Sequence, residues 1–199
     1  CRLAVVDTAP DDKINMLKAC GANLFSVDGF GTDPDVSTQT FDVVRQIAET
    51  AGTDIGVSSY TKNPAAMSAV MTMAFELAEQ SDRPIDRIVV PAGAGGFALA
   101  TARGFKIAKS ESLCDWCPAV DVVQPEGNDT MASALIHGTA PQEITCTSNV
   151  SGLQVPVVMD ATNVCKEVPE TGGTGRLVTD EQVYPVSYTH LRAHETRTN

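Results

Sequence analysis

The stretch "DRIVVPAGAGG", residues 86–96, decides the fold class. Residues 88–91 form a charge-free apolar run, and glycines follow at positions 93, 95 and 96. The run predicts a buried strand that leads into a tight turn. Apolar residues at helical spacing over residues 96–109 predict a helix directly after the turn. A strand, a glycine turn and a helix in this order favour an α/β fold whose largely parallel sheet gathers ligands at the carboxyl ends of its strands.

Strand-like and helix-like segments alternate on both sides of this stretch. Helical spacing, end glycines or a starting proline predict helices, and compact apolar runs predict strands. The expected helices cover residues 11–20, 38–51, 63–78 and 130–137, and the expected strands cover residues 23–27 and 120–124. Asp11 or Asp12 is the expected N-cap of the first helix. Residues 146–170 show no clear periodicity and contain only the strand-like run "VPVVM" at 155–159.

The charge balance limits the classes of partner. The chain has 25 acidic and 14 basic residues, a formal net charge of −11 at pH 7. Because no broad positive field exists, the composition argues against nucleic acid or an anionic membrane as the main partner. The longest charge-free apolar stretch, residues 88–100, contains proline and glycine and is shorter than the ~20 residues of a membrane-spanning helix. Six irregularly spaced cysteines and no secretory leader favour a cytoplasmic protein with free thiols.

The glycine turn is the main candidate binding site. The small residues Gly93, Ala94, Gly95 and Gly96 let successive backbone N–H groups approach an anion, and the following helix adds its positive end. The turn therefore predicts a phosphate-binding loop, although close packing of strand and helix remains an alternative reading. The run "GAGGFA" also fits a dinucleotide pattern. Its acidic residue would be Glu126, which lies thirty residues beyond Gly96 instead of ~20.

Other motifs carry weaker signals. A single C-x-x-C pair, Cys114 and Cys117, lacks the second pair that a metal site needs and is interpreted as a loop with ordinary thiols. His190 and His194 stand four residues apart without a third ligand, so no metal site is expected. Residues 185–199 lose all apolar periodicity and resemble translated adapter sequence, so we interpret them as a foreign tail. The chain opens at Cys1 on a strand-like run without an initiator Met, which suggests truncation at the front.

The order of several segments resembles a known family. The runs are "DKINMLKACGANLFSVDG", "NPAAMSAVMTMAFELAEQ", "DRIVVPAGAGG", "VDVVQPEG", "TMASALIHGTAP" and "TGGTGRLVTDEQVY". Together they resemble the threonine synthases within the tryptophan synthase β-type family of pyridoxal-phosphate enzymes. The resemblance spans Arg2 to Tyr184, and its most specific parts are the Asn63-Pro64 helix start and the glycine loop.

The resemblance implies a fold, a cofactor and a reaction. The fold would be two-lobed and three-layer αβα with mostly parallel sheets, and incomplete: residues 1–60 would be the remainder of the smaller lobe and residues 61–184 part of the larger, cofactor-binding lobe. The cofactor would be pyridoxal 5'-phosphate, with its phosphate on Gly93 to Gly96. The family reaction converts O-phosphohomoserine and water into threonine and phosphate. Lys13 and Asn63 are the implied contacts to this small amino-acid substrate, with a solvated surface lysine as the alternative reading of Lys13.

The same resemblance implies what the chain lacks. The family's Schiff-base lysine lies upstream of the residues seen here, and the group that contacts the pyridine nitrogen lies downstream. We therefore expect no catalytic residue in this chain, which as given would be inactive. A homodimer is left open by the sequence.

One departure from the family pattern concerns the substrate. Where the family has a basic residue two positions after Asn-Pro, this chain has Ala66. An arginine there would bind a substrate phosphate through two parallel hydrogen bonds. Two alternatives therefore stay open: a related enzyme that performs β-elimination or replacement on serine, threonine or cysteine derivatives, and a noncatalytic paralogue or fragment.

Overall fold

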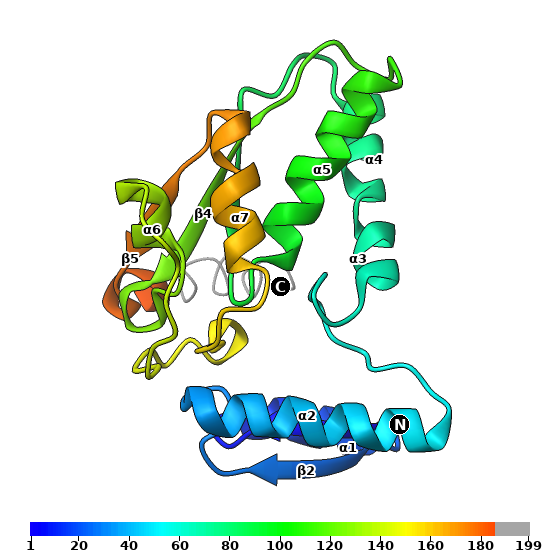
Figure 1. Cartoon of the computed structure of the whole chain (residues 1–199), viewed down its shortest axis with the longest axis vertical. Helices are drawn as coiled ribbons and strands as arrows, with labels where there is room; N and C mark the ends of the chain where they lie inside the picture. The colour runs from blue at the N-terminus through cyan, green and yellow to red at the C-terminus, as the bar shows by residue number, and fades with distance from the viewer. Residues whose placement is uncertain (186–199) are drawn as a thin grey trace, which may run out of the picture.

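The smaller of two α/β lobes is formed by the first 51 residues of the computed structural model, which describes residues 1–185 (Figure 1). Strands β1 (Arg2–Val6) and β2 (Asn23–Val27) pair in parallel, with Arg2 opposite Asn23 and Val6 opposite Val27. Helix α1 (Asp11–Ala19) connects them, and α2 (Pro34–Ala51) follows. The lobe therefore begins with a βαβ unit.

The larger lobe contains three parallel strands in the order β3-β4-β5. Its strands are β3 (Arg87–Pro91), β4 (Ala119–Pro125) and β5 (Gly175–Val178). Its helices are α3 (Pro64–Val70), α4 (Thr72–Gln80), α5 (Gly96–Ser110), α6 (Ala132–His137) and α7 (Ala161–Glu167). Three short 3-10 turns, η1 (Glu126–Asn128), η2 (Ser151–Leu153) and η3 (Pro169–Thr171), complete the lobe. Every described strand pair is parallel, which confirms the α/β fold class.

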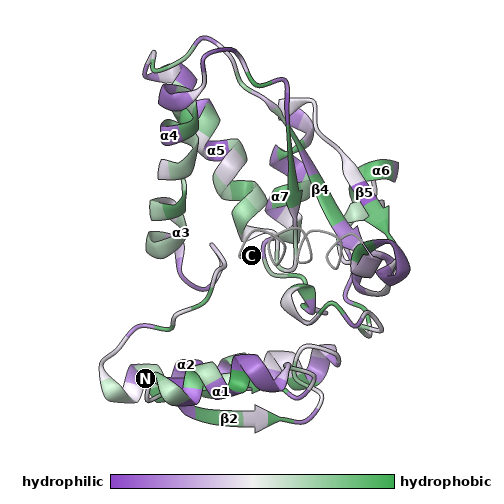
Figure 2. Ribbon diagram, turned by 180° about the vertical axis from the view of Figure 1, so that it is seen from behind, coloured by the Kyte–Doolittle hydropathy of each residue, from purple (hydrophilic) through white to green (hydrophobic). Residues whose placement is uncertain are grey.

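The core lies between one face of the larger sheet and helix α5. Val90, Val120 and Val122 of the sheet pack with Leu99 of α5 and Val164 of α7, and all five are buried. Figure 2 shows β4 as a mainly apolar strand, whereas α2 mixes apolar and polar residues along its length. This burial positions the first turn of α5 at the carboxyl end of β3.

Most expected elements are confirmed, within a few residues at their ends. Gly52 and Gly138 adopt the left-handed conformation at the ends of α2 and α6. The expected N-cap of α1 was wrong, because Pro10 occupies that position and Asp11 and Asp12 lie in the first turn.

The single helix expected over residues 63–78 was also wrong, because the chain breaks it at Met71 into α3 and α4. The Thr72 hydroxyl donates to Ala69 O, and the Met71 amide donates to Ser68 O, three residues back, at 3.2 Å. These bonds compete with continuous helical hydrogen bonding at this point.

The region 146–170 differs most from expectation. Residues 155–159 pair with no described strand, and Pro156 has no N–H to donate to a ladder. Helix α7 was missed because it spans only two turns and lacks a clear apolar period.

Candidate functional site

The predicted loop forms one turn at the start of α5. Gly95 is the N-cap, with φ of 94°, a conformation that side chains other than glycine rarely adopt. A Cβ on Gly93 would lie 2.9 Å from Val155 Cγ2, and one on Gly96 would lie 2.7 Å from Ser58 O. The turn therefore has no room for side chains and exposes only backbone to a ligand.

Free amide groups give this turn its chemistry. Within residues 1–185, the N–H groups from Ala94 to Phe97 donate no hydrogen bond, and the Leu99 amide is the first to donate, to Gly95 O at 3.0 Å. Unpaired amides at the positive end of a fifteen-residue helix can bind an anion. This donor set fits a phosphate group. The structure brings all four predicted residues together, while their contact with a cofactor stays a prediction.

A segment from the middle of the chain lies against the turn. Asn128 Nδ2 donates to Leu153 O at 2.7 Å, and Val155 N donates to Asn128 Oδ1 at 3.2 Å. Asn128 is fully buried. Asn128 of η1, just after β4, therefore holds residues 153–155 beside Gly93.

A buried aspartate fastens the segment between the lobes to the same place. Asp160 accepts hydrogen bonds from Ser59 Oγ (3.1 Å), from Tyr60 N (2.8 Å), and from the amide and hydroxyl of Thr61 (2.9 Å each). Its Oδ2 would lie 2.9 Å from a Cβ on Gly96. Residues 59–61 are thereby held next to the glycine turn.

The smaller lobe reaches the site through the loops after its strands. Thr8, just after β1, donates to Gln154 Oε1 at 2.5 Å. Cys146 N donates to Thr32 O at 2.8 Å, in the loop after β2. Figure 1 shows the yellow segment around η2 above this edge of the smaller lobe. The candidate site therefore lies where loops of both lobes meet beside the glycine turn.

Among the described residues, no hydrogen bond or ion pair joins either of the two predicted substrate contacts to the turn. Lys13 is exposed on α1. Asn63 caps α3, since its Oδ1 accepts from Ala66 N at 3.1 Å and its Nδ2 donates to Ile55 O at 2.9 Å. Their contact with substrate stays a prediction. Lys62, the neighbour of Asn63, was not among the predicted residues; its ammonium lies 5.8 Å from the centre of the Phe41 ring in α2.

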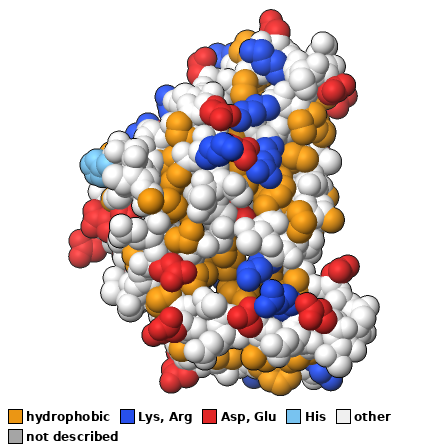
Figure 3. All heavy atoms as spheres, viewed as in Figure 1, with side chains coloured by type: hydrophobic (Ala, Val, Ile, Leu, Met, Phe, Trp, Pro, Cys, Tyr) orange, Lys and Arg blue, Asp and Glu red, His pale blue; other side chains and the backbone are white. Residues whose placement is uncertain are grey.

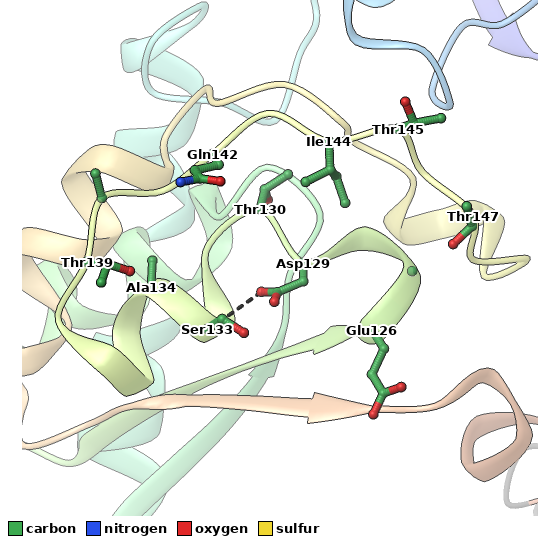
Figure 4. A pocket seen from close by; sticks show the side chains of 12 residues that line it. Glu126, Asp129, Thr130, Ser133, Ala134, Thr139, Gln142, Ile144, Thr145 and Thr147 are labelled. Carbon is green, nitrogen blue, oxygen red and sulfur yellow. Dashed lines mark hydrogen bonds between the residues drawn. The ribbon is translucent and has the colours of Figure 1, made fainter.

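A separate polar cavity of about 490 Å³ opens beyond the end of β4 (Figure 4). Glu126, Asp129, Thr130 and Ser133 line one side of it, and the segment 139–147 lines the other. Asp129 Oδ1 accepts a hydrogen bond from Ser133 N at 2.9 Å. The lining includes no residue of the glycine turn.

The remaining motifs show no convergent chemistry. Cys114 and Cys117 are both partly buried, and Cys114 Sγ donates to Trp116 O at 3.2 Å. Burial raises the pKa of the Cys117 thiol. Residues 1–185 contain no cluster of three or more His, Cys, Asp or Glu side chains that could hold a metal ion. The pair His190 and His194, like most of the expected foreign tail 185–199, lies outside the described residues.

The surface carries both signs of charge. Figure 3 shows lysine and arginine side chains interleaved with aspartate and glutamate on one face. In the part of the chain that the structure describes, no helix is both long and apolar enough to cross a membrane.

Comparison with known proteins identifies the family. The profile described as pyridoxal-phosphate dependent enzyme matches residues 1–189, and the chain belongs to this family. A threonine synthase from Methanosarcina acetivorans is 31% identical over 125 residues, which cover 61% of this chain and 31% of the archaeal protein.

Solved structures support the same fold. Serine racemase from Dictyostelium discoideum matches with a TM-score of 0.61 at 20% identity, covering 92% of this chain and 53% of its own. Threonine deaminase isoform 2 from Solanum lycopersicum matches with a TM-score of 0.60 at 19% identity. The match covers 89% of this chain and 47% of the tomato protein. The chain spans about a third to a half of the length of these relatives. Pyridoxal 5'-phosphate is the cofactor of the family, as the resemblance implied.

Proposed function

We propose that the whole protein is a pyridoxal-phosphate dependent enzyme that acts on a small amino acid, and that residues 93–97 bind the 5'-phosphate of the cofactor. The observation that carries this proposal is the glycine turn with free amides at the start of α5. Backbone amides at a helix N-terminus favour a phosphate strongly. The alternative reading of the turn as mere close packing leaves these donors without a purpose.

The bound cofactor supplies an electron sink for a carbanion at the substrate. The residues of this chain bind its phosphate and fix its place where the loops of the two lobes meet. Residues 153–155 and Ser58 pack against two sides of the turn and hold it in place. The lysine that attaches the cofactor and moves the proton is expected upstream of this chain.

For the reaction, we propose threonine formation from O-phosphohomoserine and water. The 31% identity to a threonine synthase supports this choice. A second candidate is β-elimination or replacement on serine, threonine or cysteine derivatives. Ala66 favours it, because this exposed position in the first turn of α3 offers no cation for a substrate phosphate. A noncatalytic paralogue that keeps only the anion-binding loop is the third reading.

Cofactor titration of the full-length protein tests the proposal. We expect the visible absorbance of protein-bound pyridoxal phosphate in the wild type. Gly95→Asp should weaken binding more than about tenfold, because its Cβ would lie 2.8 Å from Val164 Cγ2 in the core and the residue would be strained at positive φ, so the turn could not keep its conformation. Gly138→Asp is the matched control, since Gly138 also has positive φ but lies in open space at the end of α6. Equal affinity of all three proteins would mean that the turn only packs.

The two substrates can be separated by turnover. If the threonine synthase reaction is correct, full-length protein forms threonine from O-phosphohomoserine. Ala66→Arg should then raise kcat/KM by about tenfold, through one charge-assisted phosphate contact. Release of an oxo acid from serine or threonine, with no threonine formed by either protein, would instead support the elimination reaction.

A further inference from the structure

We infer that Gln124 is a positioning residue for the glycine turn, holding its peptide groups so that their N–H bonds face the phosphate. The inference rests on the proposed cofactor binding at residues 93–97. It assigns to a buried side chain of β4 the task of setting the direction of the N–H donors in the glycine turn, which follows the neighbouring strand β3.

Gln124 connects three parts of the larger lobe. Its side chain is fully buried in β4, on the core face that also carries Val120 and Val122. Nε2 donates to Thr130 Oγ1 at 3.0 Å and to the carbonyls of Ala92 and Gly93 at 3.3 Å each. The amide therefore contacts the glycine turn from the core side.

The other end of the same amide fixes the start of α6. Gln124 Oε1 accepts from Met131 N at 2.8 Å and from Ala132 N at 3.0 Å. The side chain thus uses both its donor and its acceptor capacity. A fully bonded buried amide has one orientation, because turning it over would set donor against donor and oxygen against oxygen.

Because peptide units are planar, the orientation of the loop carbonyls also sets the direction of the loop N–H groups. The carbonyl of Gly93 and the N–H of Ala94 belong to one planar trans unit and point in opposite directions. Since Nε2 holds Gly93 O toward the core, the Ala94 N–H must point away from the core, where it has no described partner. The carbonyl of Ala92 fixes the Gly93 N–H in the same way. Glycine peptides could otherwise rotate freely.

Two substitutions separate positioning from packing. Gln124→Met keeps the volume but removes every hydrogen bond. Gln124→Glu keeps the acceptor for α6 but sets a carboxylate against the two loop carbonyls. Thr130→Val is the matched control, because it removes one partner of Nε2 and leaves both loop contacts in place.

The readout is the ratio of affinities for pyridoxal 5'-phosphate and for pyridoxal, which lacks the phosphate. In the full-length protein, both Gln124 variants should lose at least about tenfold in this ratio, which corresponds to ~1.4 kcal/mol, while pyridoxal affinity changes less than about twofold. Thr130→Val should keep the wild-type ratio within about twofold. A residue that only stabilises the fold would lower the melting temperature and leave the ratio unchanged.

An unchanged ratio in folded Gln124 variants overturns the inference and leaves the proposed function intact. Failure of the wild type to bind pyridoxal phosphate refutes the proposed function itself, and this inference with it. If neither variant folds, hydrogen exchange in the wild type decides. Pyridoxal phosphate must then slow hydrogen exchange at the Ala94 amide, and pyridoxal must not. An Ala94 amide that exchanges equally fast with and without pyridoxal phosphate overturns the inference.

Discussion

At the scale of single residues, Asp121 shows how a charge can be buried in a strand. It lies in the middle of β4, and its side chain is fully buried. Arg176 Nε donates to its Oδ2 at 2.5 Å, Thr174 N donates to its Oδ1 at 3.1 Å, and Arg87 pairs with it from β3. Burial raises the pKa of the carboxyl, but these hydrogen bonds and the two positive charges outweigh it and hold the pKa below its usual range.

The lowered pKa of Asp121 gives the stability of the protein a pH dependence. A carboxyl whose pKa is lower in the folded state stabilises it above the unfolded pKa of about 3.9, and this contribution is lost as pH falls through the folded value. Asp121→Asn leaves two arginines facing each other, so the free energy of unfolding at pH 7 should fall by about 2 kcal/mol. Urea denaturation at pH 7 and pH 3 measures the free energy of unfolding of the wild type and the variant. The difference between wild type and variant should shrink at the lower pH.

Asp42→Asn provides the control for Asp121→Asn. Asp42 pairs with Arg45 on the surface of α2, where both side chains are about half exposed. Such a pair contributes at most ~0.5 kcal/mol. Equal decreases in the free energy of unfolding in the two variants would contradict a special role for the buried carboxylate of Asp121.

The residues of the site differ in how far the sequence could predict them. Gly93 to Gly96 were predictable because the turn and the helix start are local features. Gln124 and Asp160 were not, since their partners lie far along the chain: 31 residues for the Gln124–Gly93 contact and 101 for the Asp160–Ser59 contact. Local patterns hold no information about pairs of this kind.

At the scale of elements, close packing of α4 on α5 depends on Gly104. A Cβ on Gly104 would lie 2.7 Å from Ala74 Cβ and 2.8 Å from Met71 O. Met71 also marks the break between α3 and α4, which helical spacing alone could not predict. Apolar periodicity identified both helical stretches correctly, but the break depends on side-chain hydrogen bonds and on the helix packed behind it.

Gly104→Ala should therefore destabilise the protein, although alanine is the better helix former by about 1 kcal/mol. The backbone of Met71 would have to move, and overpacking of this kind costs about 1–3 kcal/mol. We expect a net loss of about 1 kcal/mol and a lower melting temperature by calorimetry. Gly56→Ala is the control, because a Cβ there meets nothing within 4 Å. A higher melting temperature for Gly104→Ala would show that the helices can move apart at no cost.

At the scale of the whole molecule, two lobes meet through loops and a connecting segment. The resemblance to a family implied the division at residues 60 and 61, which stays a prediction. Periodicity could not show that residues 59–61, which follow the smaller lobe in sequence, bind Asp160 of the larger one. The fold class was predictable from the alternation of strands and helices, whereas the arrangement of lobes depends on these long-range contacts.

Asp160→Ala should loosen the segment between the lobes. The substitution leaves the amides of Tyr60 and Thr61 without an acceptor, and each buried unpaired donor costs about 1–3 kcal/mol. Residues 59–61 should then leave the larger lobe and expose the peptide bond after Lys62. We expect at least about tenfold faster tryptic cleavage at Lys62 in the full-length protein, because cleavage follows the population of the open form.

Asp180→Ala is the matched control for this cleavage. Asp180 accepts from Ser148 Oγ at 2.7 Å and from Asn149 N at 2.6 Å, so its loss frees a different segment and should leave the rate at Lys62 unchanged. Mass spectrometry of early fragments distinguishes the sites. Faster cleavage at Lys62 in both variants would indicate general unfolding, and wild-type rates in Asp160→Ala would show that the smaller lobe is held without this aspartate. Selective cleavage would instead identify Asp160 as the group that fixes residues 59–61 beside Gly96, and hence the position of this segment next to the glycine turn.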